Sequence, residues 1–316
     1  MNLSMRHQTH QRHNLFRKIT ILAAAFALPA LAATAAPTGQ PLAVMGPANA
    51  WQPLFNGTDL TGWESFIGKP LAKSNVPGAE KDAKGNYTKV LGLNNDPLHC
   101  FTVVTVDGAP AIRVSGEGTG ALGTKENFSN YHLRFQFKWG EKNYAAKPTD
   151  KTPRPKGGGM IYHAHGDFGA LNGIWMNALQ YQLCEGSCAA FIIQGDSTGL
   201  IKTRAGGNPK KPVYDPAGQP TLISLAVPEC FLPENFEKPA GEWNTFEIIA
   251  LGDKVIHVLN GHVVARVENL RKGAGEKAEP LTSGHIQLQM ESAEEFFRNI
   301  EIRSIDAIPA EYAEGK

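Results

Sequence analysis

The chain has 316 residues and an almost balanced charge, with 31 lysines and arginines against 30 aspartates and glutamates. It has no basic run beyond the extreme N-terminus, so it lacks the electrostatic footprint of a nucleic-acid-binding protein. Its 33 glycines and 21 prolines favour many turns and short strands over long helices, and the length suits one large all-β domain.

The N-terminal segment has the three parts of an export signal. A basic lead over residues 6–18 is followed by an apolar run over residues 19–33, and Ala33-Thr34-Ala35 supplies small residues of the kind that a signal peptidase reads. The apolar run is shorter than the ~20 residues that a membrane-spanning helix needs. We therefore predict a signal peptide over residues 1–35 and a flexible leader over residues 36–50. The mature chain is expected to be periplasmic or secreted, without a stable membrane span.

The four cysteines fit an oxidising compartment, where disulfides persist. Four cysteines allow three pairings. A Cys184–Cys188 disulfide is favoured because the intervening loop is short and contains Gly186, and Cys100–Cys230 then follows by elimination. A zinc site is the alternative that the spacing of Cys184 and Cys188 leaves open.

After Trp51 the chain consists largely of short segments in which apolar and polar residues alternate, as in strands with one buried face. Two dipeptides typical of hairpin turns, Asp107-Gly108 and Asn260-Gly261, each join a pair of such segments. The clearest strand is Tyr131–Trp139, whose odd-numbered residues are all aromatic or leucine. The glycine-rich segment 116–123 is interpreted as a connection between strands.

Two long insertions, Glu141–Lys156 and Lys202–Gly241, interrupt this pattern and could flank a binding cleft. The sequence shows no long amphipathic helix and no internal repeat. We therefore predict a single all-β domain over residues 51–307, a sandwich of two antiparallel sheets with long loop insertions. A C-terminal tail over residues 308–316 would follow it.

The stretch Gly157–Cys188 carries the densest set of candidate functional groups, and Gly284–Glu291 alternates in the same way. Rows of uncharged polar groups facing outward from a sheet suit a hydroxyl-rich ligand, although an ordinary solvated sheet face has the same pattern. The polar groups of the two stretches are His163, His165, Gln180, Gln182, Glu185, Gln287, Gln289 and Glu291.

Several short motifs occur in a fixed order along the chain and together resemble the 3-keto-disaccharide hydrolase domain family over residues 51–305. The resemblance implies a concanavalin A-like jelly roll, an exported bacterial protein and action on oxidised sugars or glycosides. This chain departs from the family at Gln180, where a glutamate is common, and at His163, where many members have arginine or another polar residue. The motifs are Leu54-Phe55-Asn56-Gly57, Leu60-Thr61-Gly62-Trp63, Gly158-Gly159-Met160-Ile161-Tyr162-His163, Gln180-Tyr181-Gln182, Gly241-Glu242-Trp243-Asn244, Leu259-Asn260-Gly261, Leu288-Gln289 and Phe297-Arg298-Asn299-Ile300.

The resemblance implies a substrate whose C2 proton is acidic because C3 is a ketone. Loss of that proton gives an enolate, and the glycosidic oxygen on C1 can then leave by elimination. We predict His163 or Glu185 as the base, with a histidine such as His165 or a bound divalent metal polarising the ketone. His163 and His165 have the same strand parity and could share that metal, although a structural or merely exposed histidine pair fits the sequence as well.

The substrate-binding groups follow from the same implied chemistry. The glutamines 180, 182, 287 and 289 would hydrogen-bond sugar hydroxyls, and Tyr162 or Trp175 would stack against the ring. Glu291 lies on the polar side of its strand and could pair with Arg298 or His163. Arg298 shares its side with Ile300, so either a bulge re-aims it or it is a buried structural arginine. Glu294 and Glu295 are placed in a solvated loop.

Two other functions fit the same residues. One is a glycoside hydrolase with two carboxylates, Glu185 and Glu291, which would have to flank the scissile bond at about 5–9 Å. The other is a non-catalytic, lectin-like carbohydrate-binding module, because a sandwich fold does not by itself imply turnover. In each case the expected partner is a saccharide or glycoside, and no oligomeric state is predicted.

Overall fold

The computed structural model describes residues 42–43, 45–47, 49–144, 154–291 and 293–313. The predicted signal peptide and most of the predicted leader therefore lie outside the described residues. In the described part of the chain, no helix is both long and apolar enough to cross a membrane. Helical structure there is limited to two 3-10 turns, η1 (Gly275–Lys277) and η2 (Ala310–Tyr312).

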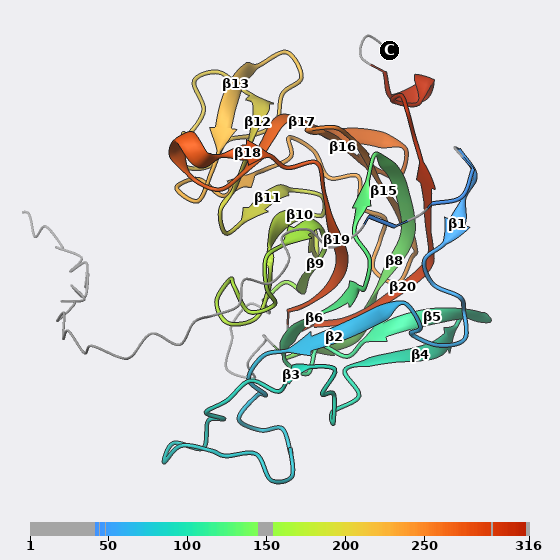
Figure 1. The fold of residues 1–316 in the computed structure, drawn as a ribbon, viewed down its shortest axis with the longest axis vertical. Helices are drawn as coiled ribbons and strands as arrows, with labels where there is room; N and C mark the ends of the chain where they lie inside the picture. Colours follow the sequence, from blue (N-terminus) through green and yellow to red (C-terminus); the bar gives the residue numbers. More distant parts are fainter. Residues whose placement is uncertain (1–41, 44, 48, 145–153, 292, 314–316) are drawn as a thin grey trace, which may run out of the picture. The chain divides into compact units, whose positions relative to one another are not determined.

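Two antiparallel sheets make up the fold, as Figure 1 shows. The eleven-stranded sheet has the order β13-β12-β17-β16-β15-β8-β20-β5-β4, with β1 paired to β20 and β18 paired to β17. Its strands are β1 (Gln52–Pro53), β4 (Phe101–Val106), β5 (Ala109–Val114), β8 (Tyr131–Asn143), β12 (Ser197–Thr203), β13 (Gln219–Ile223), β15 (Asn244–Leu251), β16 (Lys254–Leu259), β17 (His262–Lys272), β18 (Glu279–Pro280) and β20 (Ala293–Ser304).

The nine-stranded sheet has the order β14-β11-β10-β9-β19-β6-β2-β3, with β7 paired to β19. Its middle contains β9, which pairs with β10 on one side and β19 on the other. Its strands are β2 (Trp63–Ile67), β3 (Gly92–Leu93), β6 (Thr119–Thr124), β7 (Phe128–Ser129), β9 (Gly157–His165), β10 (Asn177–Cys184), β11 (Phe191–Gln194), β14 (Glu229–Cys230) and β19 (Ser283–Glu291).

The main hydrophobic core lies between the two sheets and is built by strand alternation. The odd-numbered residues of β8 from Tyr131 to Trp139 are all buried in it, as the sequence predicts. Phe135 stacks on Phe246 of β15 with ring centroids 5.3 Å apart. Fully burying one such side chain contributes roughly 1.5–3 kcal/mol, so a row of them fixes which face of β8 points inward. The predicted jelly-roll sandwich of two antiparallel sheets is confirmed.

The two hairpin turns are confirmed as well. Asp107 and Gly108 have φ values of 51° and 77°, and Asn260 and Gly261 have values of 50° and 84°. Positive φ at both central residues is what a two-residue turn of the I′ type requires, and Asp-Gly and Asn-Gly adopt it at low cost. The local sequence therefore sets the register of the β4/β5 and β16/β17 pairs at their turns.

The prediction for segment 116–123 is wrong, because most of it forms β6, a central strand between β19 and β2. The glycines that suggested a loop permit close strand packing. A Cβ at Gly120 would lie 2.4 Å from the carbonyl oxygen of Phe66. The insertion 202–241 is likewise not wholly irregular, since it contains β13 and β14.

A second hydrophobic cluster covers part of the outer face of the nine-stranded sheet, the face that points away from the core. The loop between β9 and β10 supplies Trp175 and Met176, which pack on Ile161 of β9. This loop therefore covers the β9 end nearest His165 and leaves the outer face near Gly157 to other groups.

Candidate functional site

A strip of glycine backbone opens β9. Gly157, Gly158 and Gly159 are consecutive, and Gly157 and Gly159 share the outer face with Ile161 because strand residues alternate. In the register, Gly159 lies between Gln182 of β10 and Gln289 of β19, and Gly157 pairs with Cys184. On the outer face, the bare backbone is limited to Gly157, because the amides of Gln180 and Gln289 lie over Gly159.

Four glutamines form a hydrogen-bonded cluster around this strip. The amide nitrogen of Gln180 donates to Oε1 of Gln289 at 2.8 Å and also contacts Oε1 of Gln182. Gln194 donates to Oε1 of Gln180. A Cβ at Gly159 would lie 2.7 Å from Nε2 of Gln180 and 2.8 Å from Oε1 of Gln289, so the two amides can meet because residue 159 has no side chain. The predicted outward placement of Gln180, Gln182 and Gln289 is what the structure shows, whereas Gln194 was not predicted, and Gln182 is the one left half-buried.

Glu291 ends β19 on the same outer face as Gln289. Its Oε2 lies 3.8 Å from the position that a Cβ of Gly157 would take. Glu291 is half-buried and has no hydrogen-bond or ion-pair partner among the described residues. Burial raises the pKa of its carboxyl above the usual value of 4.5. Such a carboxyl holds its proton to a higher pH than a solvated one and can exchange it closer to neutrality.

Glu295 lies against the opposite face of the same glycine strip. It is fully buried on the core side of β20, and neither carboxyl oxygen has a hydrogen-bond partner in the part of the chain that the structure describes. Burial, followed by the charge of Glu291, raises its pKa well above the usual range, which favours the neutral acid. A Cβ at Gly158 would lie only 1.7 Å from Oε1 of Glu295, so Gly158 provides the space for this carboxyl.

The expectation that Glu294 and Glu295 lie in a solvated loop is wrong, because both are buried residues of β20. Glu294 points to the other side of the strand, where its Oε1 lies 2.7 Å from a guanidinium nitrogen of Arg113. The repeated glutamates suggest a loop in the sequence, and strand pairing with β8 and β5 overrides that suggestion.

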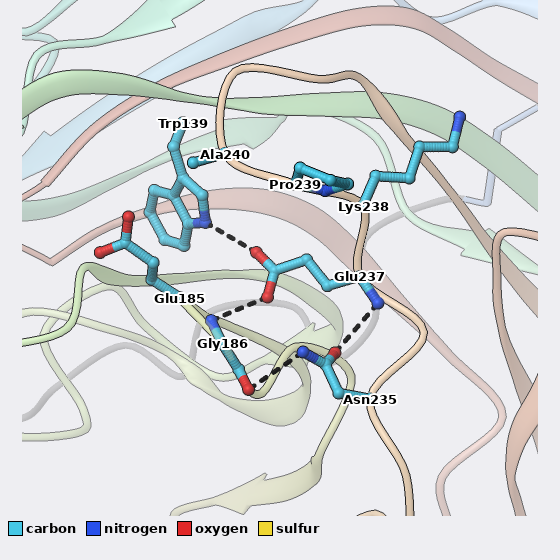
Figure 2. Close-up of a pocket in the computed structure, with 8 residues that line it drawn as sticks. All are labelled: Trp139, Glu185, Gly186, Asn235, Glu237, Lys238, Pro239 and Ala240. Carbon is cyan, nitrogen blue, oxygen red and sulfur yellow. Dashed lines mark hydrogen bonds between the residues drawn. The ribbon is translucent and has the colours of Figure 1, made fainter.

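Glu185 lies at the end of β10, beside the start of β9. Its backbone NH donates to the carbonyl oxygen of Lys156 at 3.0 Å, and its Oε1 lies 3.4 Å from the ammonium of Lys156. Its carboxylate lines a cavity of about 350 Å³ together with Trp139 and Glu237, shown in Figure 2. The sequence-predicted Glu185 is therefore accessible, but it belongs to this cavity rather than to the outer face that carries Glu291.

His163 does not face outward. It has a φ of 48° and is fully buried, and its ring lies edge-on to Tyr131 of the opposite sheet at a centroid distance of 5.6 Å. A register irregularity with β19 at this point makes Tyr162 and His163 both face the core. Burial lowers the pKa of His163 to about 3, and both ring nitrogens lack a hydrogen-bond partner. The structure thus encloses in the core the side chain that the sequence analysis proposed as a base.

His165 lies at the other end of β9 and both of its ring nitrogens face acceptors. Nδ1 is 3.0 Å from the carbonyl oxygen of His163, and Nε2 is 2.9 Å from Oδ1 of Asp196. His165 therefore offers no free ring nitrogen to a metal shared with His163. In the described part of the chain, no group of three or more His, Cys, Asp or Glu side chains could hold a metal ion.

The histidines and Glu185 are not brought together. β9 has nine residues, and at a rise of ~3.3 Å per residue its two ends are about 25 Å apart. His165 marks one end, whereas Glu185 lies beside Lys156 at the other. These groups cannot act on one sugar ring, and the predicted set divides into a glycine end and a histidine end.

The predicted stacking residues are both unavailable as sugar platforms. Tyr162 faces the core, where its hydroxyl lies 2.7 Å from Nε2 of His257. Trp175 is buried under its own loop and donates from Nε1 to the carbonyl oxygen of Gly120 at 3.0 Å. Gln287 is on the outer face but fully buried, with its amide nitrogen 3.0 Å from the sulfur of Met176.

Arg298 is on the other sheet from the glutamines. A register irregularity between Arg298 and Glu301, with Asn299 at a φ of 50°, re-aims its side chain to the outer face of the eleven-stranded sheet. There its guanidinium stacks on Trp243 at 3.9 Å and its Nε donates to Gln136 at 2.8 Å. The bulge alternative is therefore confirmed, and Arg298 cannot contact a ligand that Gln180 and Gln289 hold.

The predicted disulfides are absent, because all four cysteines are free thiols. The Cys188 thiol donates a hydrogen bond to the carbonyl oxygen of Cys184 at 3.3 Å and is not joined to the Cys184 sulfur. Cys100 immediately precedes β4 and Cys230 ends β14, and these strands lie at opposite ends of the two sheet orders. Proximity in sequence and elimination among four cysteines did not identify spatial pairs.

The structure thus brings together Gln180, Gln182, Gln289 and Glu291 of the predicted set. Sequence reasoning did not single out the glycines of β9, Glu237 or Glu295. The three consecutive glycines at the start of a strand were a usable signal, because glycine inside a strand often marks a close approach of other groups. Nothing in the sequence indicated that Glu237, in a proline-rich insertion, would reach Trp139.

A family model described as the 3-keto-alpha-glucoside-1,2-lyase-like domain matches residues 50–303. No curated protein matches the sequence significantly.

Solved structures with similar folds share little sequence with this chain. A Parabacteroides distasonis protein described provisionally as a glycosyl hydrolase is 17% identical, covers 81% of this chain and 94% of its own, and has a TM-score of 0.40. The carbohydrate-binding module CBM66 from Bacillus subtilis is 12% identical, with 65% and 92% covered and a TM-score of 0.36. A Bacillus licheniformis beta-glucanase is 10% identical, with 82% and 99% covered and a TM-score of 0.36.

Proposed function

Because this chain belongs to the family of 3-keto-alpha-glucoside-1,2-lyase-like domains, we propose that it cleaves 3-keto-glucosides by elimination at the glycine end of β9. The single observation that supports this site best is Glu291, a half-buried carboxyl without a partner among the described residues. Beside it lies Gly157, which has no side chain and lets a sugar ring approach the backbone closely.

The proposed reaction needs one proton to move from carbon to oxygen. A base removes the C2 proton, the electron pair forms an enolate with the C3 ketone, and the C1–O1 bond then breaks with formation of the C1–C2 double bond. The departing oxygen takes up a proton, and the product is an enone together with the released alcohol. Addition of water at C1 would complete a net hydrolysis.

Glu291 is proposed to carry the proton in both directions. Its ionised form accepts the proton from C2, and the resulting acid returns it to the departing O1. A group that must act first as base and then as acid works best with a pKa near the working pH. The burial that raises the pKa of Glu291 moves it in that direction.

Gln182 is proposed to stabilise the enolate. Its Oε1 accepts a hydrogen bond from Gln180, which leaves the amide NH₂ group of Gln182 to donate toward the outer face. A fixed donor at the C3 oxygen would stabilise the negative charge that develops there. The remaining glutamines of the cluster hold Gln182 and Gln180 in place.

The experiment that tests this proposal compares 3-keto-glucosides with their unoxidised parents, using the mature protein and the variant Glu291→Gln. The unmodified protein should cleave only the oxidised sugars, and Glu291→Gln should lower kcat by about 10²–10⁴-fold, the range that general acid–base catalysis contributes. Glu279→Gln is the matched control, because this carboxylate is exposed on β18 of the other sheet. Full activity of Glu291→Gln would refute the proposed role.

A carbohydrate-binding module without turnover is the second candidate. The observation in its favour is that Gln180, Gln194 and Gln289 are hydrogen-bonded to one another, which gives a fixed amide surface and no reacting group. This function predicts saccharide binding and no cleavage of either substrate set. The two-carboxylate alternative is less favoured, because Glu185 belongs to a different cavity from Glu291.

We also propose that the protein is exported, on the signal-like residues 1–35. Expression in a bacterial host followed by fractionation and N-terminal sequencing tests this. A mature N-terminus near Ala36 in the periplasmic or extracellular fraction is expected, and full-length cytoplasmic protein would refute it.

A further inference from the structure

The cavity that Glu185 lines lies beside the end of β10, against Trp139 of β8. Its volume is about 350 Å³, enough for one pyranose ring, and it is lined by groups from three separate parts of the chain. Trp139 comes from β8, Glu185 follows β10, and Asn235, Glu237 and Ala240 come from the proline-rich insertion. Figure 2 shows the carboxylates of Glu185 and Glu237 on the two sides of the Trp139 indole.

Glu237 is held rigidly in this cavity. Its Oε1 accepts a hydrogen bond from Nε1 of Trp139 at 3.1 Å, and its Oε2 accepts one from the backbone NH of Gly186 at 2.8 Å. Asn235 reinforces this arrangement, because it donates to the Gly186 carbonyl oxygen at 3.1 Å and accepts from the backbone NH of Glu237 at 2.9 Å. A carboxylate fixed in this way is pre-organised and needs no rearrangement to receive a ligand.

The cavity wall offers acceptors with little competing positive charge. The ammonium of Lys238 donates to the carbonyl oxygen of Trp243 at 3.1 Å, and Figure 2 shows this side chain pointing away from the cavity. The ammonium of Lys156 lies 3.4 Å from Oε1 of Glu185, and the backbone NH of Lys156 donates to Oε2 at 3.4 Å, so both contacts are long. Each carboxylate oxygen can accept more than one hydrogen bond, so Glu185 and Glu237 keep acceptor capacity for a ligand.

We propose that this cavity is a second saccharide-binding site, which takes one pyranose ring through its hydroxyl or ammonium donors. The indole of Trp139 and the ring of Pro239 supply the apolar wall for the carbon face of the sugar. Glu185 and Glu237 accept hydrogen bonds from its polar edge. The site favours an amino sugar, tolerates a neutral hexose and disfavours a uronic acid, because two carboxylates attract a cation and repel an anion.

This site is independent of the elimination proposed for Glu291. Glu185 follows β10 next to Cys184, and Gly157, beside which Glu291 lies, pairs with Cys184. The two sites are therefore neighbours at one end of the nine-stranded sheet, but they use different carboxylates. One sugar chain could be anchored in the cavity while another unit lies on the glycine strip.

The test is a titration of the full chain with glucosamine, glucose and glucuronate at neutral pH, followed by NMR of the protein. We expect glucosamine to bind at least several-fold more tightly than glucose, and glucuronate to bind at least tenfold more weakly than glucosamine. Ala240→Trp should fill the cavity and weaken glucosamine binding at least tenfold. Ala240 is exposed, so this variant is expected to fold, and its thermal unfolding checks that.

Two further variants separate the sites. Glu185→Gln should reduce the preference for glucosamine over glucose, whereas Glu291→Gln should leave glucosamine binding unchanged. Cleavage of 3-keto-glucosides by Ala240→Trp should stay within twofold of the unmodified protein. Equal binding of glucuronate and glucosamine, or unchanged glucosamine binding by folded Ala240→Trp, would overturn the proposal whatever the outcome for Glu291.

Discussion

The two ends of β9 differ in how their polar groups are satisfied. At the histidine end, His165 has an acceptor at each ring nitrogen, and Trp175 and Met176 cover the outer face. At the glycine end, Glu291 and Glu295 have no hydrogen-bond partners among the described residues, and Gly157 leaves the backbone bare on the outer face. Both ends carry residue types typical of catalysis. His163 also lacks partners among the described residues, but it is enclosed in the core, whereas Glu291 is half-buried on the outer face, where an unsatisfied carboxyl indicates a role in binding or proton transfer.

The largest expected effect concerns the pH dependence of cleavage at the glycine end. The proposed base must be ionised, and burial raises its pKa above 4.5, so activity should fall as the pH drops through that raised value. A profile of kcat/KM for a 3-keto-glucoside between pH 4 and pH 8 measures this. For Glu291→Gln, kcat/KM should be ~10²–10⁴-fold lower and should no longer fall as the pH drops through this range. If kcat/KM of the variant still falls at low pH, the group that titrates is not Glu291.

The next effect is on stability and concerns Gly158. A Cβ there would collide with the buried carboxyl of Glu295, so Gly158→Ala should lower the free energy of unfolding by about 1–3 kcal/mol, the usual cost of overpacking. Gly157→Ala is the control, because its nearest contact is at 3.8 Å. Urea unfolding of both variants gives the comparison.

A double-mutant cycle sharpens that test. If the collision with Glu295 is the cause, adding Glu295→Ala should recover most of the stability that Gly158→Ala loses. Glu295→Ala alone should also stabilise the protein increasingly as the pH rises above 4.5. The pKa of Glu295 is raised in the folded state, so its contribution is most favourable at low pH and is lost at higher pH. If Gly158→Ala and Glu295→Ala change the free energy of unfolding additively, the collision proposed between residue 158 and Glu295 is not the cause.

A smaller effect is expected at the histidine end, where His163 should matter for stability and not for turnover. Its pKa is about 3 when folded and near 6.5 when unfolded, so its contribution is present above pH 6.5 and is lost as the pH falls. For each pH unit below 6.5, such a group lowers the free energy of unfolding by up to ~1.4 kcal/mol. His163→Leu should reduce the loss of unfolding free energy between pH 7 and pH 5, with His257 still contributing its own part. Cleavage at pH 7 should stay within twofold.

The smallest effect is expected for the pair of His165 and Asp196. The Asp196 side chain is 45% exposed, so solvent screens the interaction and its contribution is about 0.2–1 kcal/mol. Asp196→Asn should therefore change the unfolding midpoint slightly and leave cleavage unchanged. A loss of activity comparable to that of Glu291→Gln would move the candidate site to the histidine end and break the comparison.

Much of the fold could be predicted because the deciding signals are local. Alternation along Tyr131–Trp139 selects the buried face of β8, and Asn260-Gly261 selects the turn between β16 and β17. The candidate site could be predicted only in part. Alternation placed Gln180, Gln182 and Gln289 on the outer face correctly, but it does not show which partners a side chain meets there.

The sequence by itself determined the strand-rich architecture, most inward faces and the hairpin turns, because each depends on residues within one or two strands. Only the tertiary structure decided that His163 turns into the core, that Arg298 leaves its regular face, and that Glu295 lies buried against Gly158. Backbone bulges change the inward and outward alternation at His163 and Arg298, and the close approach of β20 to β9 buries Glu295. Such features depend on the packing of strands distant in sequence, which a local pattern does not contain.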